Sequence, residues 1–267
     1  MSNRQADEIR QTVRRVYGEV ARRGGGCGCA PSCCGGEGPA IPAAIEAARL
    51  GYSPQELAEI PAGAEMGLGC GNPQAIASLK PGETVLDLGS GGGVDCFLAA
   101  RQVGDTGRVI GVDMTAEMIG KARNSAAEGG YANVDFRLGE IERLPVADGA
   151  VDVILSNCVI NLSPDKPGVY REAYRVLKPG GRLAIADVVA TAPLPEEVRN
   201  DLALLSGCVA GAATIDELEK TLAEVGFENI RIQPKDESRE FIRDWAEGHN
   251  VADYIVSATI EAVKPGL

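Results

Sequence analysis

Residues 85–93 read VLDLGSGGG, an apolar run followed directly by a glycine-rich turn. A helical pattern begins near residue 95, so the turn is expected to join a buried strand to a helix. A glycine-rich turn indicates a nucleotide-type site only in this context. Asp113 ends the next strand-like run, 20 residues after Gly93. A carboxylate there can accept hydrogen bonds from both hydroxyls of a ribose. The segment therefore predicts a nucleotide-type site at the carboxyl ends of two strands.

Strand-like and helical runs alternate on both sides of this turn. Strands are expected at residues 84–88, 108–113, 134–138, 151–156 and 182–188, with helices near 95–103, 116–128 and 166–177. This alternation is typical of a parallel sheet covered by helices on both faces, so the predicted fold class is α/β. Two later strand-like runs, 229–233 and 254–262, are expected to complete the sheet at its edge.

The flanking segments carry helix signals of their own. Ser53 and Thr214 are each followed three residues later by a glutamate, and this capping pattern predicts a helix after each of them. The N-terminal segment is expected to form an amphipathic helix that ends at glycines 24–26. Its apolar residues recur at helical spacing: Ile9, Val13, Val16, Tyr17 and Val20.

The length of 267 residues fits one large domain with additions better than two equal domains. We divide the chain into an N-terminal helix and cysteine-rich loop (1–65), a central α/β domain (66–190) and a C-terminal segment with the last strands (191–267). The C-terminal segment is expected to cover the substrate.

The formal net charge of −12 disfavours binding to phosphate backbones and to anionic membranes. The first residues carry charges where a signal peptide needs an apolar run, and no stretch is long enough to span a bilayer. We therefore expect a cytoplasmic protein with neither a nucleic-acid partner nor a membrane partner. The eight cysteines would stay reduced there, so they are interpreted as free thiols, catalytic groups or metal ligands rather than disulfides.

The glycine motif and the cysteine contexts together resemble a known family. Spacing alone also fits a nicotinamide-dependent oxidoreductase, but Asp87 gives the motif the form D-x-G-x-G-x-G, which resembles class I methyltransferases. From about residue 9 to the C-terminus, the chain resembles the arsenite methyltransferases. The matching segments are GCGNP at 69–73, DLGSGGGVDC at 87–96, SNCVINL at 156–162 and EAYRVLKPGG at 172–181.

This resemblance implies a class I, Rossmann-like methyltransferase sheet whose N- and C-terminal additions cover the active site. It also implies S-adenosylmethionine as the cofactor of the central domain. The glycine turn would pass the amino-acid end of the cofactor, and Glu140 and the Ile141 amide would meet the adenine, although a solvated loop acid is the alternative for Glu140. The implied cofactor contacts are Asp87, Gly89, Gly91, Gly93, Asp113, Met114, Glu140, Ile141 and Asn157.

The resemblance makes Cys70, Cys158 and Cys208 the thiolates that bind trivalent arsenic. Cys158 follows the fourth expected strand, and the carboxyl ends of strands are where an open α/β sheet binds its ligands. Trivalent arsenic is soft, so thiolates suit it. The alternative for any single cysteine is a small buried hydrophobic residue, and Cys96 is interpreted in that way.

Four further cysteines, Cys27, Cys29, Cys33 and Cys34, lie among Gly, Pro and Ser residues. Their C-x-C-x3-C-C spacing leaves a zinc site open, but the segment lacks a histidine and the paired C-x2-C of a zinc ribbon. We expect this segment to capture arsenic and hand it on.

The expected reaction is methyl transfer from S-adenosylmethionine to thiolate-bound arsenic, giving methylated arsenicals in arsenic detoxification. The arsenic lone pair attacks the methyl group, so no general base is needed, and His249, the only histidine, is interpreted as structural. The resemblance also implies a thiol reductant, thioredoxin or glutathione, as co-substrate. The rival interpretations are a methyltransferase for a small organic acceptor and a metalloid-binding protein without turnover.

Overall fold

The computed structural model describes residues 3–23, 48–199, 201, 204–205, 207–246 and 250–266. These residues form a seven-stranded sheet in the order β3-β2-β1-β4-β5-β7-β6. The strands are β1 (Thr84–Leu88), β2 (Arg108–Asp113), β3 (Val134–Leu138), β4 (Val151–Asn157), β5 (Leu177–Ala190), β6 (Glu228–Lys235) and β7 (Ile255–Val263). The first five strands are parallel, and β7 runs antiparallel to both of its neighbours. The expected α/β class and mostly parallel sheet are confirmed.

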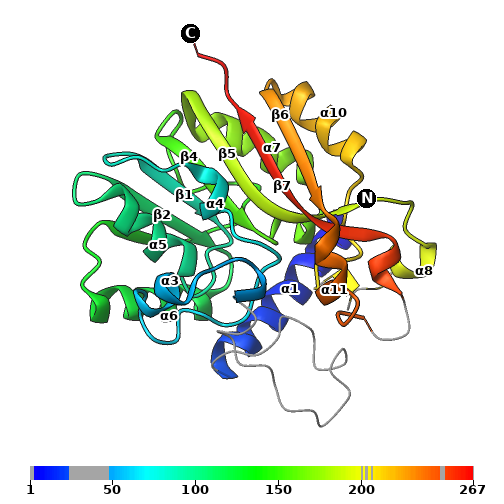
Figure 1. Ribbon diagram of the computed structural model, residues 1–267, viewed down its shortest axis with the longest axis horizontal. Coiled ribbons are helices and arrows are strands. Elements are labelled where there is room, and N and C mark those ends of the chain that lie inside the picture. The colour runs from blue at the N-terminus through cyan, green and yellow to red at the C-terminus, as the bar shows by residue number, and fades with distance from the viewer. Residues whose placement is uncertain are drawn as a thin grey trace.

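The central strands are apolar on both faces, as a sheet between two helical layers requires. Side chains alternate along β1, so Val85 belongs to the core cluster on one face and Leu86 to the cluster on the other. The Val85 face is covered by α4 (Gln74–Ala77), α5 (Val94–Val103) and α6 (Ala116–Gly129). The Leu86 face is covered by α7 (Lys166–Val176) and α10 (Ile215–Val225) (Figure 1).

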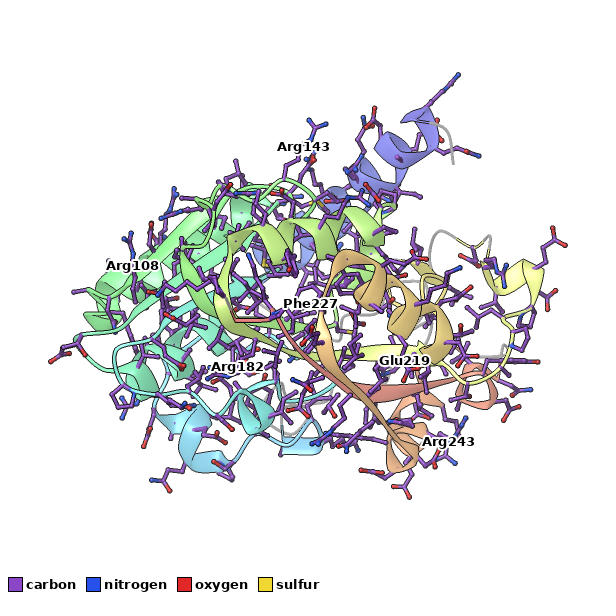
Figure 2. All side chains as sticks on the ribbon, turned by 90° about the horizontal axis from the view of Figure 1, so that it is seen from above. Arg108, Arg143, Arg182, Glu219, Phe227 and Arg243 are labelled. Carbon is purple, nitrogen blue, oxygen red and sulfur yellow. The ribbon has the colours of Figure 1, made fainter. Side chains whose placement is uncertain are left out.

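Both expected capping sequences form complete capping boxes. Ser53 caps α3 (Pro54–Ala58), and Thr214 caps α10 by accepting from Glu217 N while the Glu217 carboxylate accepts from Thr214 N. After α10 the chain places Phe227 between α7 and α10, as Figure 2 shows from above. The Phe227 ring meets the Tyr174 ring edge-on, with the ring centroids 5.2 Å apart.

The N-terminal helix α1 (Asn3–Arg23) docks as its amphipathic pattern predicts. Val13 and Val16 are buried, while Arg10 and Arg22 pair with Glu142 and Glu117. Figure 1 shows α1 at the end of the sheet opposite the C-terminus, which is the carboxyl end of the parallel strands. The glycines at which this helix was expected to end lie outside the described residues.

The 3-10 turn after β4, Ile160–Leu162, and several C-terminal segments cover the same edge of the sheet. The C-terminal segments are α8 (Glu196–Arg199), α11 (Arg239–Ile242) and the 3-10 turns Asp236–Ser238 and Val251–Asp253. A third apolar cluster joins these segments to α1 and includes Val13, Val198, Cys208 and Ile242. Within the described ranges, no helix has the length and apolar character needed to cross a bilayer.

Thr214→Ala should lower the free energy of unfolding by about 1 kcal/mol, because the substitution leaves an N-terminal N–H group of α10 without its acceptor. Urea denaturation followed by circular dichroism measures the change. Thr221→Ala is the matched control, since Thr221 bonds only a carbonyl inside the same helix, and its effect should stay within about 0.5 kcal/mol. Equal effects of the two substitutions would contradict the capping role.

Candidate functional site

The strand order reverses beside β1. The chain builds outward from β1 through β2 to β3 and then places β4 on the other side of β1. Open α/β sheets bind their ligands at the carboxyl edge of such a reversal. The glycine turn follows β1, and Asp113 and Asn157 are the last residues of β2 and β4, so all three lie at this edge.

The glycine turn is held close to β2, and a larger residue does not fit there. Gly89 N donates to the Val112 carbonyl at 2.8 Å. Gly89 has φ +69°, and an added Cβ would come within 2.4 Å of Val159. Gly93 has φ +96°, and its Cβ would come within 2.8 Å of the Phe136 ring. Glycine is therefore required at both positions, by the left-handed backbone and by the close packing of the turn.

Asp113 closes β2 and fixes the neighbouring backbone. Its carboxylate accepts hydrogen bonds from Gly91 N at 3.1 Å and from Thr115 N at 2.8 Å. Burial raises the pKa of Asp113, and these two N–H donors oppose the rise. The carboxylate is thus tied both to the glycine turn and to the start of α6.

Beside Asp113 lies a pocket of about 310 Å³. Its walls come from α1, from the ends of β2 and β3 and from the start of α6: Arg14, Met114, Thr115, Ala116, Glu117, Leu138, Gly139 and Glu140. Leu138 is 56% exposed, which makes it the one large exposed hydrophobic residue of the described part of the chain. Arg14 and Glu140, which both line the pocket, form an ion pair. An apolar platform beside a ribose-type carboxylate suits a planar ring such as adenine.

Asp87 lies beneath the glycine turn and is almost fully buried. The Cys96 thiol donates to its carboxylate at 3.3 Å, and burial raises the pKa of Asp87. Cys96 is packed into the core, as expected from the sequence, and the bond to Asp87 is an additional contact. Ile141, another predicted cofactor residue, is also buried in the core.

Asn157 fixes the loop that carries Cys70. Its side chain accepts from Cys70 N at 3.1 Å and donates to the Gly71 carbonyl at 2.7 Å and to the Tyr52 hydroxyl at 3.0 Å. The Ser257 hydroxyl holds the same loop by donating to the Cys70 carbonyl at 2.6 Å. The amide of Asn157 is therefore occupied by the protein itself, and its contact with a cofactor stays a prediction.

The structure brings the three predicted cysteines together. Cys70 Sγ, Cys158 Sγ and an Asp187 carboxylate oxygen lie within 4.8 Å of one another. Cys208 donates its thiol to the Cys158 carbonyl at 2.7 Å. Cys158 and Cys208 have φ of +55° and +63°, a left-handed conformation that is uncommon for residues with a side chain. Such strained backbone is typical of functional sites.

The pKa values of all three clustered thiols are raised. Burial raises the pKa of Cys70 to about 11. The hydrogen bond with Cys158 raises the pKa of Cys208, and burial adds to the rise. The pKa of Cys158 is also well above its ordinary value: the bond with Cys208 lowers it, but the bond with Cys70 and burial outweigh that effect.

Asp187 and Lys166 are the charged groups beside the cysteines. Asp187 is 3% exposed at the end of β5, and burial raises its pKa to about 6 against the opposing effect of the Val188 N–H. Lys166 begins α7 and interacts electrostatically with Asp187 and Cys208, while burial lowers its pKa.

Sequence reasoning missed several polar residues of this site. The signal for Asp187 is present, because a lone carboxylate interrupts the apolar run 183–189 near the carboxyl end of a strand. Tyr52 and Asp95 gave no such signal, since their hydrogen bond of 2.9 Å joins residues 43 positions apart. The predicted Cys27, Cys29, Cys33, Cys34 and His249 lie outside the described residues.

Comparisons with known proteins identify the family. The family described as "Methyltransferase domain" matches residues 79–226. A curated arsenite methyltransferase of Halobacterium salinarum is 54% identical over 99% of this chain and 69% of its own length. The chain belongs to the arsenite methyltransferase family. It also belongs to the broader family of class I methyltransferases, as its sheet order indicates.

Two more members of the arsenite methyltransferase family support this assignment. The arsenite methyltransferase of Aquipseudomonas alcaligenes is 40% identical over 84% of this chain, which spans 63% of that relative. The crystal structure of an arsenic(III) S-adenosylmethionine methyltransferase from Chlamydomonas reinhardtii has a TM-score of 0.63 and 35% identity, covering 86% of this chain and 75% of that one. The chain thus spans roughly two thirds of the curated relatives it matches.

Asn157→Ala should release the Cys70 loop, because it removes three hydrogen bonds of a largely buried amide. Cys70 is 1% exposed, so its alkylation by iodoacetamide requires local opening. Losing about 1.4 kcal/mol of loop stability would speed that alkylation about tenfold, as measured by mass spectrometry of the Cys70 peptide. Asn133→Ala, which removes bonds to Ala100 and Gly104 instead, should leave the rate unchanged. An unchanged rate in Asn157→Ala would mean that other contacts hold the loop.

Proposed function

We propose that this protein transfers methyl groups from S-adenosylmethionine to trivalent arsenic held by Cys70, Cys158 and Cys208. The observation that carries the proposal is the convergence of these three thiols at the carboxyl edge of the sheet, beside the glycine turn. The names of the curated relatives support it. The three cysteines come from separate segments of the chain, so packing alone gives no reason for them to meet.

We propose that the glycine turn and the pocket beside Asp113 bind S-adenosylmethionine. When bound, this cofactor supplies a methyl group on a sulfonium. We propose that Asp113 accepts hydrogen bonds from the ribose, that Met114, Glu140 and Ile141 meet the adenine, and that Gly89, Gly91 and Gly93 leave room for the amino-acid end. The pocket beside Asp113, with Leu138 exposed at its wall, supports this arrangement. Asp87 would add negative charge beneath the turn. Asn157, whose side chain holds the Cys70 loop, is also proposed to contact the cofactor.

Protonated thiols suit arsenous acid as the incoming substrate. Each thiol can give its proton to a hydroxide on arsenic, which leaves as water while a sulfur–arsenic bond forms. No general base is needed for this exchange or for attack by the arsenic lone pair. The raised pKa of the thiols therefore does not prevent loading of the site.

Several finer features complete the proposal. Cys27, Cys29, Cys33 and Cys34 would capture arsenic and pass it to the three clustered thiols. A cytoplasmic thiol reductant, thioredoxin or glutathione, would keep the site reduced between methylations. The segment 191–267 would cover the substrate, as the apolar cluster around Cys208 and Val198 supports.

The deciding experiment is transfer of labelled methyl groups from S-adenosylmethionine to arsenite in excess thiol. The wild-type protein should form methylarsenic, and Cys158→Ser should lose at least about 99% of that activity, because the loss of one ligand from a soft, three-thiolate site weakens substrate binding and positioning together. Cys96→Ser makes the same change outside the cluster and keeps a donor to Asp87, so it should stay within about threefold of wild type. A wild-type protein that binds the cofactor but methylates no arsenite would disprove the proposal.

Asp113→Ala should weaken binding of S-adenosylmethionine about tenfold or more, because hydrogen bonds to a charged group contribute about 1.5–3 kcal/mol. Isothermal titration calorimetry measures the affinity, and circular dichroism checks the fold. Asp105→Ala is the matched control, since Asp105 is exposed in the turn before β2, at the opposite edge of the sheet. Equal affinities of the two variants would contradict a cofactor role for Asp113.

A further inference from the structure

Asp187 is a buried carboxylate that the proposed cysteine chemistry does not use. It lies on β5 next to Ala186, whose carbonyl accepts from the Cys70 thiol at 3.6 Å. One of its oxygens lies within 4.8 Å of both Cys70 Sγ and Cys158 Sγ. Any atom that bridges these two sulfurs is therefore close to the carboxylate.

Three N–H donors surround the carboxyl group of Asp187. Its oxygens accept from Ile160 N at 3.1 Å, Asn161 Nδ2 at 2.9 Å and Val188 N at 2.8 Å. Three N–H donors converging on one carboxyl group favour the anion. Since a carboxylate can accept about four hydrogen bonds, its charge is fixed in place and only partly neutralised. Lys166, at the start of α7, also faces Asp187 but interacts with Cys208 as well.

Methyl transfer moves a positive charge toward this carboxylate. The arsenic lone pair forms the arsenic–carbon bond, the carbon–sulfur bond breaks, and its electron pair stays on the departing thioether. The sulfonium charge disappears, and arsenic bound to three thiolates gains one positive charge. The step needs no oxidant, reductant or proton.

We propose that Asp187 stabilises the positive charge that develops on arsenic during methyl transfer, which makes it a catalytic residue outside the set of sulfur ligands. This inference rests on the proposed function. A fixed anion in a water-poor site stabilises the transition state more than the ground state, because the positive charge lies on the sulfonium before the transfer and on arsenic, beside the carboxylate, after it. Asp187 should therefore affect the rate of transfer much more than the binding of either substrate.

The test is Asp187→Asn under single-turnover conditions, with arsenite and S-adenosylmethionine pre-bound to the protein. The rate of methyl transfer should fall about 10²–10³-fold, as for loss of other preorganised electrostatic groups. Equilibrium dialysis of arsenite and calorimetry of the cofactor should give affinities within about threefold of wild type. Asp135→Asn, on the edge strand β3 with ion pairs to Arg108 and Arg137, is the matched control and should transfer methyl groups at the wild-type rate. Transfer by Asp187→Asn within threefold of wild type would overturn the inference.

A second variant separates charge from packing if Asp187→Asn folds poorly or binds arsenite weakly. Asp187→Ala leaves a space for a small molecule, and formate should restore transfer at least tenfold while the uncharged, similarly shaped formamide should not. Equal rescue by the two molecules, or rescue by neither, would overturn the inference. If the wild-type protein itself binds the cofactor but methylates no arsenite, the proposed function fails and this inference fails with it. If the wild-type protein methylates arsenite and Asp187→Asn does so equally fast, the proposed function stands and only this inference fails.

Discussion

The parallel pairing of β1, β2, β4 and β5 is the constraint on which the site depends. Because these strands point the same way, their carboxyl ends deliver the glycine turn, Asp113, Asn157 and Asp187 to a single edge. Cys70 and Cys208 come from segments that lie over that edge. Without the parallel order, Cys70 and Cys158, which are 88 positions apart in the chain, would have no reason to meet.

A network of hydrogen bonds between buried and half-buried polar groups links the helix after the glycine turn to the loop that carries Cys70. Asp95, near the start of α5, accepts from the Tyr52 hydroxyl at 2.9 Å. The same hydroxyl accepts from Asn157, and Asn157 holds the backbone of Cys70. Buried hydrogen bonds of this kind are costly to break singly, because each partner is left without a replacement in water. These hydrogen bonds therefore fix the position of the Cys70 loop relative to α5.

Most of the fold could be predicted from the sequence because its signals are local. The apolar run before Gly89, the acid at Asp113 and the capping pairs at Ser53 and Thr214 are each visible in a few adjacent residues, and the structure confirms the elements that they predict. The meeting of the cysteines was expected from a family resemblance, not from spacing. The left-handed backbone at Cys158 and the clamp made by Asn157 could not be predicted, because both depend on partners from distant parts of the chain.

The raised pKa values of the clustered thiols favour a substrate that itself carries a group able to accept the thiol protons. A divalent metal such as zinc binds thiolates, so it must displace protons from thiols whose pKa values burial and mutual hydrogen bonds have raised. Arsenous acid carries hydroxides that accept those protons and leave as water, so the same burial hinders it far less. Burial of Cys70 and Cys208 would then discriminate against metal ions while it admits trivalent arsenic. If the three cysteines hold arsenic as we propose, the apolar surroundings of the thiols would contribute to the specificity of the site alongside the sulfur atoms.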